Sequence, residues 1–513
     1  MKKKKAKVSI MEIMQEHVTS LYVAIMLLIF PLFYRNNYID ILRAKRDFYF
    51  TVTFFFLGMM VLLALFAILE RGKGNSPFTK KLNIKSALFL FLLLAVVIWL
   101  IGGFGSGHLT DAFWGETGRY LGIMVYLSGA AVMLILARFL KWSAFLTWAF
   151  LLGVSGVYLL QILNEWQIDI LGMKENLATD QYSIFIGTIG NLNFNAAFNS
   201  ITVAALMVLF LNSKEKISMW IYAIVLFLGF TGSFCCRSDS AFLGIGASFL
   251  VILGHVFLQK KKLDKVWIEG AVFLLALGVT ALFYTLFRKN AYTFDGVMQV
   301  ALNGKLLAVM AAFLVLCALV WRWVKDKDKL YLWLGRVYWG ILLICALAFF
   351  TVFGMANIGK AGETGWLAKF RYNDAWGSNR GYVWSRSWQL FFKLSPEKKV
   401  FGCGINCYSY LMNEHFGEEA RALYMAKYID AHNEYLQMLV TTGIAGFIGY
   451  FGMILTVLAK SVRSVAKDER ALLGIVGIAA FLAQGIANSS QITILPFVFI
   501  GLGIYLSILR KSQ

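Results

Sequence analysis

The chain has 513 residues, of which 59% are hydrophobic and 15% are charged, and its mean hydropathy is +0.68. Soluble globular domains contain fewer apolar and more charged residues, so this composition excludes that class. The formal net charge is +21, but the Lys and Arg residues cluster in short segments beside apolar runs. There they fix membrane orientation and contact anionic lipid, so we expect membrane lipids and no nucleic acid among the partners.

Apolar runs long enough to cross a bilayer recur along almost the whole chain. We predict an all-α polytopic membrane protein with about fourteen transmembrane helices, in one integral membrane domain over residues 1–513. The predicted spans are 18–34, 49–69, 86–101, 120–137, 143–163, 194–211, 217–234, 241–258, 267–287, 306–321, 337–353, 436–459, 471–486 and 492–509.

The distribution of Lys and Arg between alternate loops predicts which loops face the cytoplasm. If the basic N-terminus is inside, the basic loops at 260–265 and 460–470 are cytoplasmic, whereas 102–118 and 487–491 carry no Lys or Arg. The loop between the first two spans disagrees, so the orientation of this first hairpin stays open. Its basic residues are Arg35, Arg43, Lys45 and Arg46.

This topology places three segments at the outer face: residues 164–193, a turn at 235–239 and a long extracytoplasmic loop at 354–435. The loop is rich in aromatic residues, which argues against disorder, and long ordered loops usually carry function. Cys403 and Cys407 lie in it and pair only if the loop faces an oxidising compartment. Four cysteines at zinc-like spacing are absent from the sequence, so we expect no metal site.

The long loop contains amphipathic helices. Arg380, Trp384 and Trp388 recur at every fourth position, which puts them on one face of a helix that ends before Pro396. A planar guanidinium at headgroup depth suits a phosphate, whereas tryptophan there is either an interfacial anchor or a substrate platform. Arg386 lies on a different face of the same helix. We expect a second helix around 418–428.

Three further features of the predicted outer face each have more than one interpretation. Arg237 ends a span, where a charge indicates either function or snorkelling to lipid phosphates. Asn191, Asn193 and Asn195 open the sixth span and either cap that helix or line a polar cavity. His432, in the sequence Asp-Ala-His-Asn-Glu before the twelfth span, is a general base, a phosphate donor or a capping bystander.

The order of these motifs resembles the O-antigen ligase and O-antigen polymerase superfamily. The chain shows Gly-Asn-x-Asn at a span start, an arginine and a serine just after a span, Arg-x-x-x-Trp before a proline and Gly-x-Gly, and then Ala-His-Asn-x-x-Leu with Thr-Gly-Ile-x-Gly. Such proteins are membrane glycosyltransferases with a helical bundle of the C-type (GT-C). The resemblance implies transfer of a glycan from an undecaprenyl diphosphate carrier to an acceptor hydroxyl, without cofactor or metal. It also implies an outer-face site at the bacterial cytoplasmic membrane.

Carried over by motif, the resemblance implies that His432, Arg380 and Arg237 are catalytic. Their surroundings nominate substrate-binding residues, which are Arg386, Asn433, Asn195 and Trp384. The usual Ser-Arg-Gly of the family is Cys236-Arg237-Ser238 here. Chemistry agrees with these roles, because a departing diphosphate needs fixed positive charge and an acceptor hydroxyl needs a base of near-neutral pKa.

Two other classes compete with this interpretation. A flippase or transporter of lipid-linked oligosaccharides would also have many spans, but such proteins show two similar halves, and this chain does not. A scaffold leaves the arginines at the membrane edge unexplained. Ligase and polymerase share these motifs, so the sugar and the acceptor (a glycan, a lipid or a protein) stay open, as does the oligomeric state.

Overall fold

The computed structural model describes residues 10–69, 86–287, 296–358, 365–425 and 427–511. The long helices in this part of the chain are α1 (Ile10–Leu28), α2 (Ile41–Leu69), α3 (Ala87–Phe104), α5 (Ile123–Phe139), α6 (Ala144–Glu165), α7 (Leu192–Asn212), α8 (Lys216–Cys235), α9 (Asp239–Gln259), α10 (Leu263–Leu286), α12 (Gly304–Trp323), α13 (Lys327–Asn357), α14 (Trp376–Lys393), α16 (Tyr408–Tyr424), α17 (Glu434–Ser464), α18 (Leu472–Gln484) and α19 (Leu495–Lys511).

Short elements connect these helices. They are α4 (Leu109–Trp114), η3 (Thr179–Gln181), β1 (Phe185–Ile186), β2 (Gly190–Asn191), α11 (Gly296–Ala301), η4 (Trp366–Phe370), α15 (Pro396–Phe401) and η5 (Glu469–Ala471). The two strands pair antiparallel, with Phe185 opposite Asn191, and they bring the chain directly to the start of α7.

The prediction of an all-α polytopic membrane protein is confirmed. Each of the fourteen predicted spans coincides with a helix of the described chain, and ten of these helices are long and apolar enough to cross a membrane. The apolar helices α5 and α19 are somewhat shorter. Helix α18 has only 13 residues, fewer than the roughly 20 that a full crossing needs.

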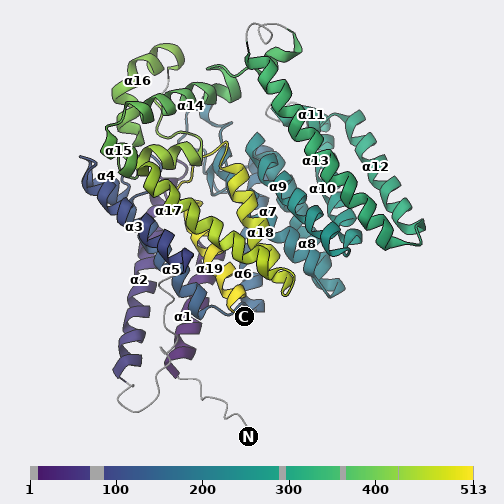
Figure 1. Ribbon diagram of the computed structural model, residues 1–513, viewed down its shortest axis with the longest axis horizontal. Helices are drawn as coiled ribbons and strands as arrows, with labels where there is room; N and C mark the ends of the chain where they lie inside the picture. Colours follow the sequence, from purple (N-terminus) through teal and green to yellow (C-terminus); the bar gives the residue numbers. More distant parts are fainter. Residues whose placement is uncertain (1–9, 70–85, 288–295, 359–364, 426, 512–513) are drawn as a thin grey trace.

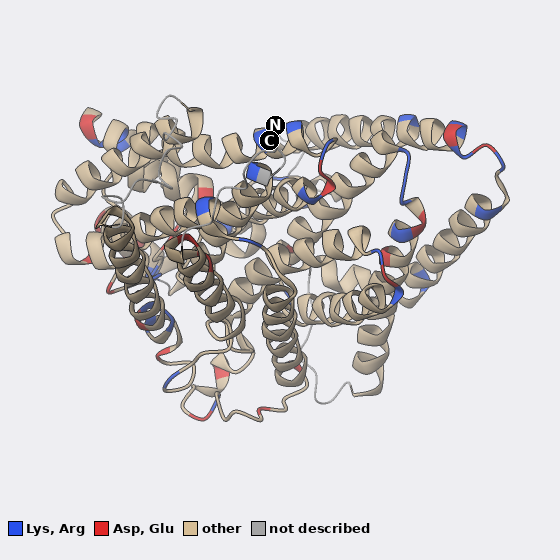
Figure 2. Cartoon of the chain, turned by 90° about the horizontal axis from the view of Figure 1, so that it is seen from below, with Lys and Arg blue, Asp and Glu red and all other residues tan. Residues whose placement is uncertain are grey.

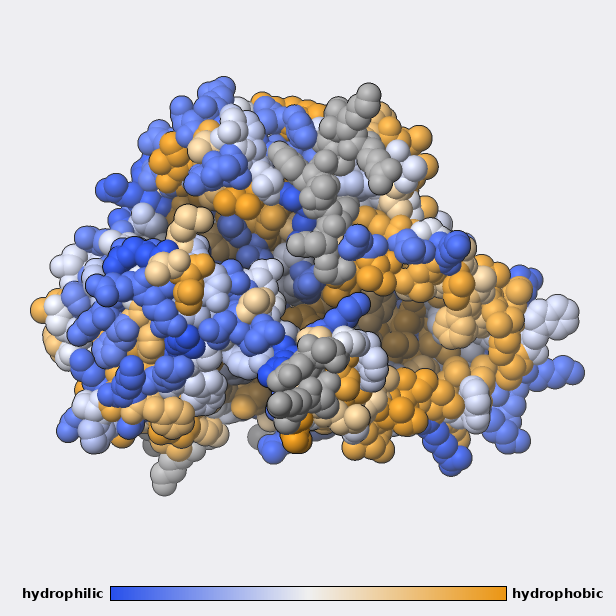
Figure 3. All heavy atoms as spheres, turned by 90° about the horizontal axis from the view of Figure 1, so that it is seen from above, coloured by the Kyte–Doolittle hydropathy of each residue, from blue (hydrophilic) through white to orange (hydrophobic). Residues whose placement is uncertain are grey.

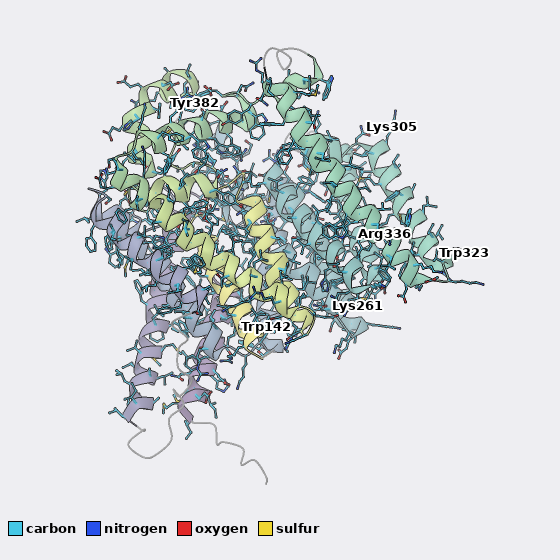
Figure 4. All side chains as sticks on the ribbon, in the orientation of Figure 1. Trp142, Lys261, Lys305, Trp323, Arg336 and Tyr382 are labelled. Atoms are coloured by element: carbon cyan, nitrogen blue, oxygen red, sulfur yellow. The ribbon has the colours of Figure 1, made fainter. Side chains whose placement is uncertain are left out.

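The helices form a bundle with its outer-loop elements at one end (Figure 1). Helix α7 contacts α8, α9 and α18 near the middle, while α12 and α13 lie at one edge. Helices α14, α15 and α16 lie at the upper end, whereas α1 begins and α19 finishes at the lower end. The labelled side chains Trp142 and Lys261 lie toward this lower end, and Tyr382 lies at the upper one (Figure 4).

Charged residues lie mainly at helix ends and in connecting segments, and most of each long helix is uncharged (Figure 2). The upper face is hydrophilic over α14 to α16 and more hydrophobic over α10 to α13, and it is hollowed between these two parts (Figure 3). A polar loop region therefore stands beside an apolar helix group at the same end of the bundle.

Three of the four basic residues of the first hairpin contact protein groups, and the fourth, Arg43, is exposed. Arg35 forms ion pairs with Asp40 and Asp47 at 2.8 and 2.9 Å, and buried Lys45 donates to the carbonyl of Phe30 at 2.6 Å. Arg46 donates to the carbonyl of Gly115, in the 102–118 loop. This hairpin therefore lies beside the 102–118 loop, and three of its charges are matched by protein groups.

Small residues bring α17 against α3. A Cβ atom on Gly449 would lie 2.7 Å from the Ala95 nitrogen, and one on Gly446 would lie 3.0 Å from the Ile98 side chain. Glycines recur at every third residue from Gly443 to Gly452, and Gly446 and Gly449 in this series permit the close packing against α3. Gly443 differs from the other glycines: its φ of +65° interrupts the helix, and a Cβ there would lie 2.3 Å from the Val400 carbonyl.

The interruption at Gly443 fixes the long loop to α17. Gly402 has φ +81°, and the next residue, Cys403, donates its N–H to the Val440 carbonyl at 3.3 Å. Gly404 donates to the Thr441 carbonyl at 3.0 Å. These backbone bonds join the segment between α15 and α16 to the broken turn of α17, so the loop is held by the membrane helix that follows it.

The helix boundaries in the loop differ in part from expectation. Regular helix begins at Arg380, because Gly377, Ser378 and Asn379 have positive φ inside α14. The helix expected at 418–428 is instead α16, which starts ten residues earlier and ends at Tyr424. Met425 ends it in the left-handed conformation, with φ 47°. Cys403 and Cys407 are buried free thiols in this structure.

The topology leads to a labelling prediction. Glu418 is exposed on α16, and Lys214 is exposed in the turn between α7 and α8. This turn lies beside the lower end of α10, because Lys265 of α10 donates a hydrogen bond to it. We expect Glu418→Cys to react with an impermeant maleimide in intact cells, and Lys214→Cys to react only after permeabilisation. Both variants also carry Cys345→Ser, because Cys345 is exposed. The reverse pattern would place the long loop in the cytoplasm.

The α3–α17 contact leads to a stability prediction. Gly449→Val must displace the α3 backbone, whereas Gly340 on α13 has no atom within 4 Å of its Cβ position. We expect Gly449→Val to destabilise the protein by about 1–3 kcal/mol, the usual cost of overpacking, and Gly340→Val to change little. Thermal unfolding of both in one detergent measures this difference. Equal midpoints would show that the close approach does not contribute to stability.

Candidate active site

The start of α17 lies in the middle of the candidate site. Asn433 caps this helix by accepting the Leu436 N–H at 3.0 Å. His432 precedes the cap with a φ of 46°, and its N–H donates to Asp430 Oδ1 at 2.8 Å. The same carboxylate oxygen lies 3.4 Å from His432 Nδ1. The left-handed residue and the carboxylate together fix where the imidazole stands.

Asp430 is a buried carboxylate with several donors. The Arg119 guanidinium forms an ion pair with it through Nε, and the Ser489 hydroxyl lies 3.4 Å from Oδ1. Arg119 itself sits over the Phe194 ring, with its Cζ 4.8 Å from the ring centroid. The 105–122 segment, the start of α7 and the α18–α19 link therefore meet the start of α17 at this residue.

These side chains enclose a small polar pocket, which we call the outer polar pocket because the predicted topology places this end of the helices outside. It is lined by Arg119, Asn191, Asn193, Phe194, Asp430, His432, Asn488 and Ser489. Its wall includes residues of the α18–α19 link, where Asn488 donates to the Ser240 hydroxyl at 2.8 Å. Four separate chain segments thus contribute to one cavity.

Arg380 is not a lining residue of this pocket but lies beside it, close enough to His432 to affect the pKa of that histidine. Its Nε donates to the carbonyl of Ala487, next to the lining residue Asn488, at 3.0 Å, and Nη1 donates to the carbonyl of Gly377 at 3.1 Å. Burial lowers the pKa of Arg380, while the carboxylates of Asp239 and Asp430 raise it. An arginine remains charged under these conditions. Arg380 therefore supplies a fixed positive charge close to His432.

The surroundings favour a neutral imidazole. Partial burial lowers the pKa of His432, the charges of Arg119 and Arg380 lower it further, and Asp430 opposes them. Burial raises the pKa of Asp430, but the charge of Arg119, the imidazole of His432 and the hydrogen bonds from both residues together outweigh burial and hold the pKa of this carboxyl well below its ordinary value. A neutral histidine next to an ionised aspartate has a free ring nitrogen that can accept a proton.

Arg237 belongs to a neighbouring network. Its Nε lies 3.2 Å from Glu165 Oε2, with 9% of the arginine side chain and none of the glutamate side chain exposed. Nη2 of Arg237 donates to the Ser183 carbonyl, and Tyr284 donates to Glu165. Arg237 does not line the outer polar pocket. The structure thus places Arg380 close to His432, whereas Arg237, in the α8–α9 turn, pairs with Glu165 at the end of α6.

That turn nevertheless reaches the pocket. Ser238 donates to Asn193 Oδ1 at 2.7 Å, and Asp239 lies close enough to Arg380 to affect its pKa. The backbone at Arg237 is left-handed, with φ 46°. The ion pair with Glu165 therefore fixes a strained turn whose next residues contact the site.

The predicted substrate-binding residues Arg386 and Trp384 lie on α14, within the long loop. Arg386 pairs with Glu419 at 2.5 Å and with Asp374 at 3.3 Å, and it stacks over the Tyr382 ring. Trp384 packs against Trp376, with ring centroids 5.4 Å apart. These contacts join α14 to α16, and neither residue lines the outer polar pocket.

The two predicted asparagines also make protein contacts. Besides capping α17, Asn433 donates from Nδ2 to the Ile486 carbonyl at 2.9 Å. Asn195 is fully buried, accepts from Gln161 Nε2 at 2.7 Å, and donates to the carbonyls of Ile186 and Gly190. Asn191 caps α7 by accepting the Asn193 N–H. Of the asparagine cluster, Asn191 and Asn193 face the pocket.

The sequence interpretation assigned no role to four pocket residues, which are Arg119, Asp430, Asn488 and Ser489. A signal existed for Arg119, because it is the first basic residue after a predicted outer loop that lacks Lys and Arg. Asp430 stands two residues before the predicted base. Nothing in the residues 487–491 by themselves indicates that they line a site.

The buried Glu165–Arg237 pair leads to a stability prediction. Arg237→Gln leaves a carboxylate inside the protein without its cation, and removal of one partner of a buried pair typically costs about 3–5 kcal/mol. We expect the double change Glu165→Gln with Arg237→Gln to recover most of the thermal stability. If the double variant is stable but inactive, Arg237 also serves catalysis. A double variant no more stable than the single one would contradict the pairing.

A family model for O-antigen ligase matches residues 296–451. The match covers α11 to α13, the long loop and the first half of α17, so it includes both Arg380 and His432. No curated protein matches the chain. The match agrees with the motif order and with the polytopic helical fold, and it supports a place for this multi-pass membrane chain in the O-antigen ligase and polymerase superfamily.

Proposed function

We propose that the protein transfers a glycan from an undecaprenyl diphosphate carrier to an acceptor hydroxyl at the outer face of the cytoplasmic membrane. The observation that carries this proposal is that Arg380 lies close to His432 of the outer polar pocket, although 51 intervening residues separate them in the sequence. A permanent cation and a neutral imidazole are the two groups that such a transfer needs.

The first role is binding of the diphosphate. As the bond between the sugar and the diphosphate breaks, negative charge develops on the leaving oxygen, and a preorganised guanidinium stabilises it. Arg380 is held by two backbone carbonyls, of Ala487 and Gly377. Those bonds orient the side chain before substrate arrives. We propose that this arginine replaces a metal ion as the source of positive charge.

The second role is activation of the acceptor. The acceptor hydroxyl oxygen attacks the anomeric carbon, the bond to the diphosphate oxygen breaks, and undecaprenyl diphosphate leaves with the electron pair. The hydroxyl proton passes to His432. Because Asp430 lies on the Nδ1 side of the ring, Nε2 is the nitrogen that faces substrate. Asp430 then stabilises the imidazolium that forms, as a carboxylate beside a catalytic histidine does.

Other predicted residues act through the structure around the pocket. We propose that Arg237 supports catalysis through the α8–α9 turn, since Ser238 and Asp239 in that turn reach the site. Asn433 and Asn195 hold the starts of α17 and α7. Arg386 and Trp384 hold α14, and the loop surface beside them is where we place the bulk of the glycan.

The role of His432 leads to a kinetic prediction. General-base assistance is typically worth roughly 10² to 10⁴ in rate. We therefore expect His432→Ala and His432→Gln to lose transfer at saturating donor by that order, while donor binding stays close to wild type. Purified protein with a carrier-linked glycan and an acceptor allows binding and turnover to be measured separately.

His415→Gln is the matched control, because His415 is exposed on α16 and, within the residues that the structure describes, hydrogen-bonds only to its own helix. An amide forms hydrogen bonds but does not take the proton. Near-normal turnover by His432→Gln would rule out proton abstraction. Loss of donor affinity with an unchanged saturated rate would instead assign His432 to phosphate binding.

A further inference from the structure

Arg119 occupies a position in the outer polar pocket that its sequence context does not explain. It lies in the segment that connects α4 to α5. Asp111 fixes this segment, because it accepts from the Thr117 N–H at 2.9 Å, from Asn406 Nδ2 at 3.1 Å and from the Tyr410 hydroxyl at 2.6 Å. The carbonyl of Arg119 accepts the Ile492 N–H at 3.3 Å. The backbone that carries Arg119 is therefore held from both sides.

The guanidinium is oriented as firmly as its backbone. One edge contacts Asp430 through Nε, and one face lies over the Phe194 ring. Within the residues that the structure describes, the terminal nitrogens of Arg119 donate to no protein acceptor. The side chain is 16% exposed and lines the pocket beside His432. An oriented fork of donors thus borders the cavity.

Asp430 does not need those terminal nitrogens. Its oxygens already receive the Arg119 Nε–H, the His432 N–H and the Ser489 hydroxyl. A purely structural ion pair would be expected to use the guanidinium fork on the carboxylate. In this structure the terminal nitrogens of Arg119 are available to another acceptor. A phosphate matches them, because these donors are planar and paired.

We propose that Arg119 is a second anion-binding residue of the outer polar pocket, which binds the diphosphate of the lipid carrier together with Arg380. Asp430 then has two partners with different tasks: it orients Arg119 toward the diphosphate and His432 toward the acceptor. The inference rests on the proposed function, since it names a further contact for the same donor. It also explains how the site contains two guanidinium groups although Arg237 is bonded to Glu165 and to the Ser183 carbonyl.

The test uses the full chain in lipid nanodiscs and two probes, undecaprenyl diphosphate and undecaprenyl monophosphate. Arg119→Lys keeps a cation for Asp430 but loses the fork, and Arg119→Gln loses the charge. We expect each to weaken diphosphate binding by about tenfold or more, the usual effect of one charged hydrogen-bonding partner, with a smaller loss for the monophosphate. Arg380→Lys serves as the comparison within the site, and Arg421→Gln on exposed α16 serves as the control.

The outcomes separate the inference from the function. If Arg119→Lys unfolds at the wild-type temperature and binds diphosphate as tightly as wild type, while Arg380→Lys weakens binding, Arg119 is structural and the proposed function stands. If wild-type protein binds neither probe, the proposed function fails and the inference fails with it. Should Arg119→Gln not fold, the lysine variant alone decides.

Discussion

The polar link between α18 and α19 is the contact on which the candidate site depends. Its backbone and side chains bond to α14, to the start of α17, to α7 and to α9. Buried main-chain groups must find partners, and in this link the partners come from segments far apart in the sequence. Each pocket residue is therefore positioned by the same few residues, although these residues carry no charge.

A buried carboxylate sets the electrostatics around that link. An ionised Asp430 inside the protein is costly unless it is paired and hydrogen-bonded. The structure meets this requirement with Arg119, with a backbone amide and with a hydroxyl. The same arrangement places a positive group on one side of Asp430 and an uncharged imidazole on the other. Asp430 thus forms the ion pair with the positive group and also separates the anion-binding side of the site from the side that takes up the proton.

The sequence was sufficient to predict the membrane helices and the order of motifs. Apolar run length determines a span almost by itself, and the motif around His432 identifies a helix start through its asparagine cap. The sequence did not reveal that Arg119 and Arg380 both lie near His432, because that proximity depends on tertiary bonds from the 102–118 loop and the α18–α19 link. Arg237 shows the same limit: its motif resembles a catalytic one, but its ion pair with Glu165 requires the position of α6.

The long loop shows how a soluble-looking region is fixed onto a membrane bundle. Gly443 breaks α17 and exposes carbonyls that the Gly402–Gly404 segment uses. Glycine is required there because the backbone is left-handed and the two segments approach closely. Arg380 lies beside the pocket on this anchored loop, so its place depends on a glycine in another helix.

A structure of the protein in nanodiscs with undecaprenyl diphosphate would test the central claim most directly. The account predicts that the diphosphate lies in the outer polar pocket, with its oxygens in hydrogen-bonding distance of Arg380 and with His432 facing the side from which an acceptor arrives. A diphosphate bound elsewhere, with the pocket at the start of α17 left unchanged and remote from it, would contradict the account.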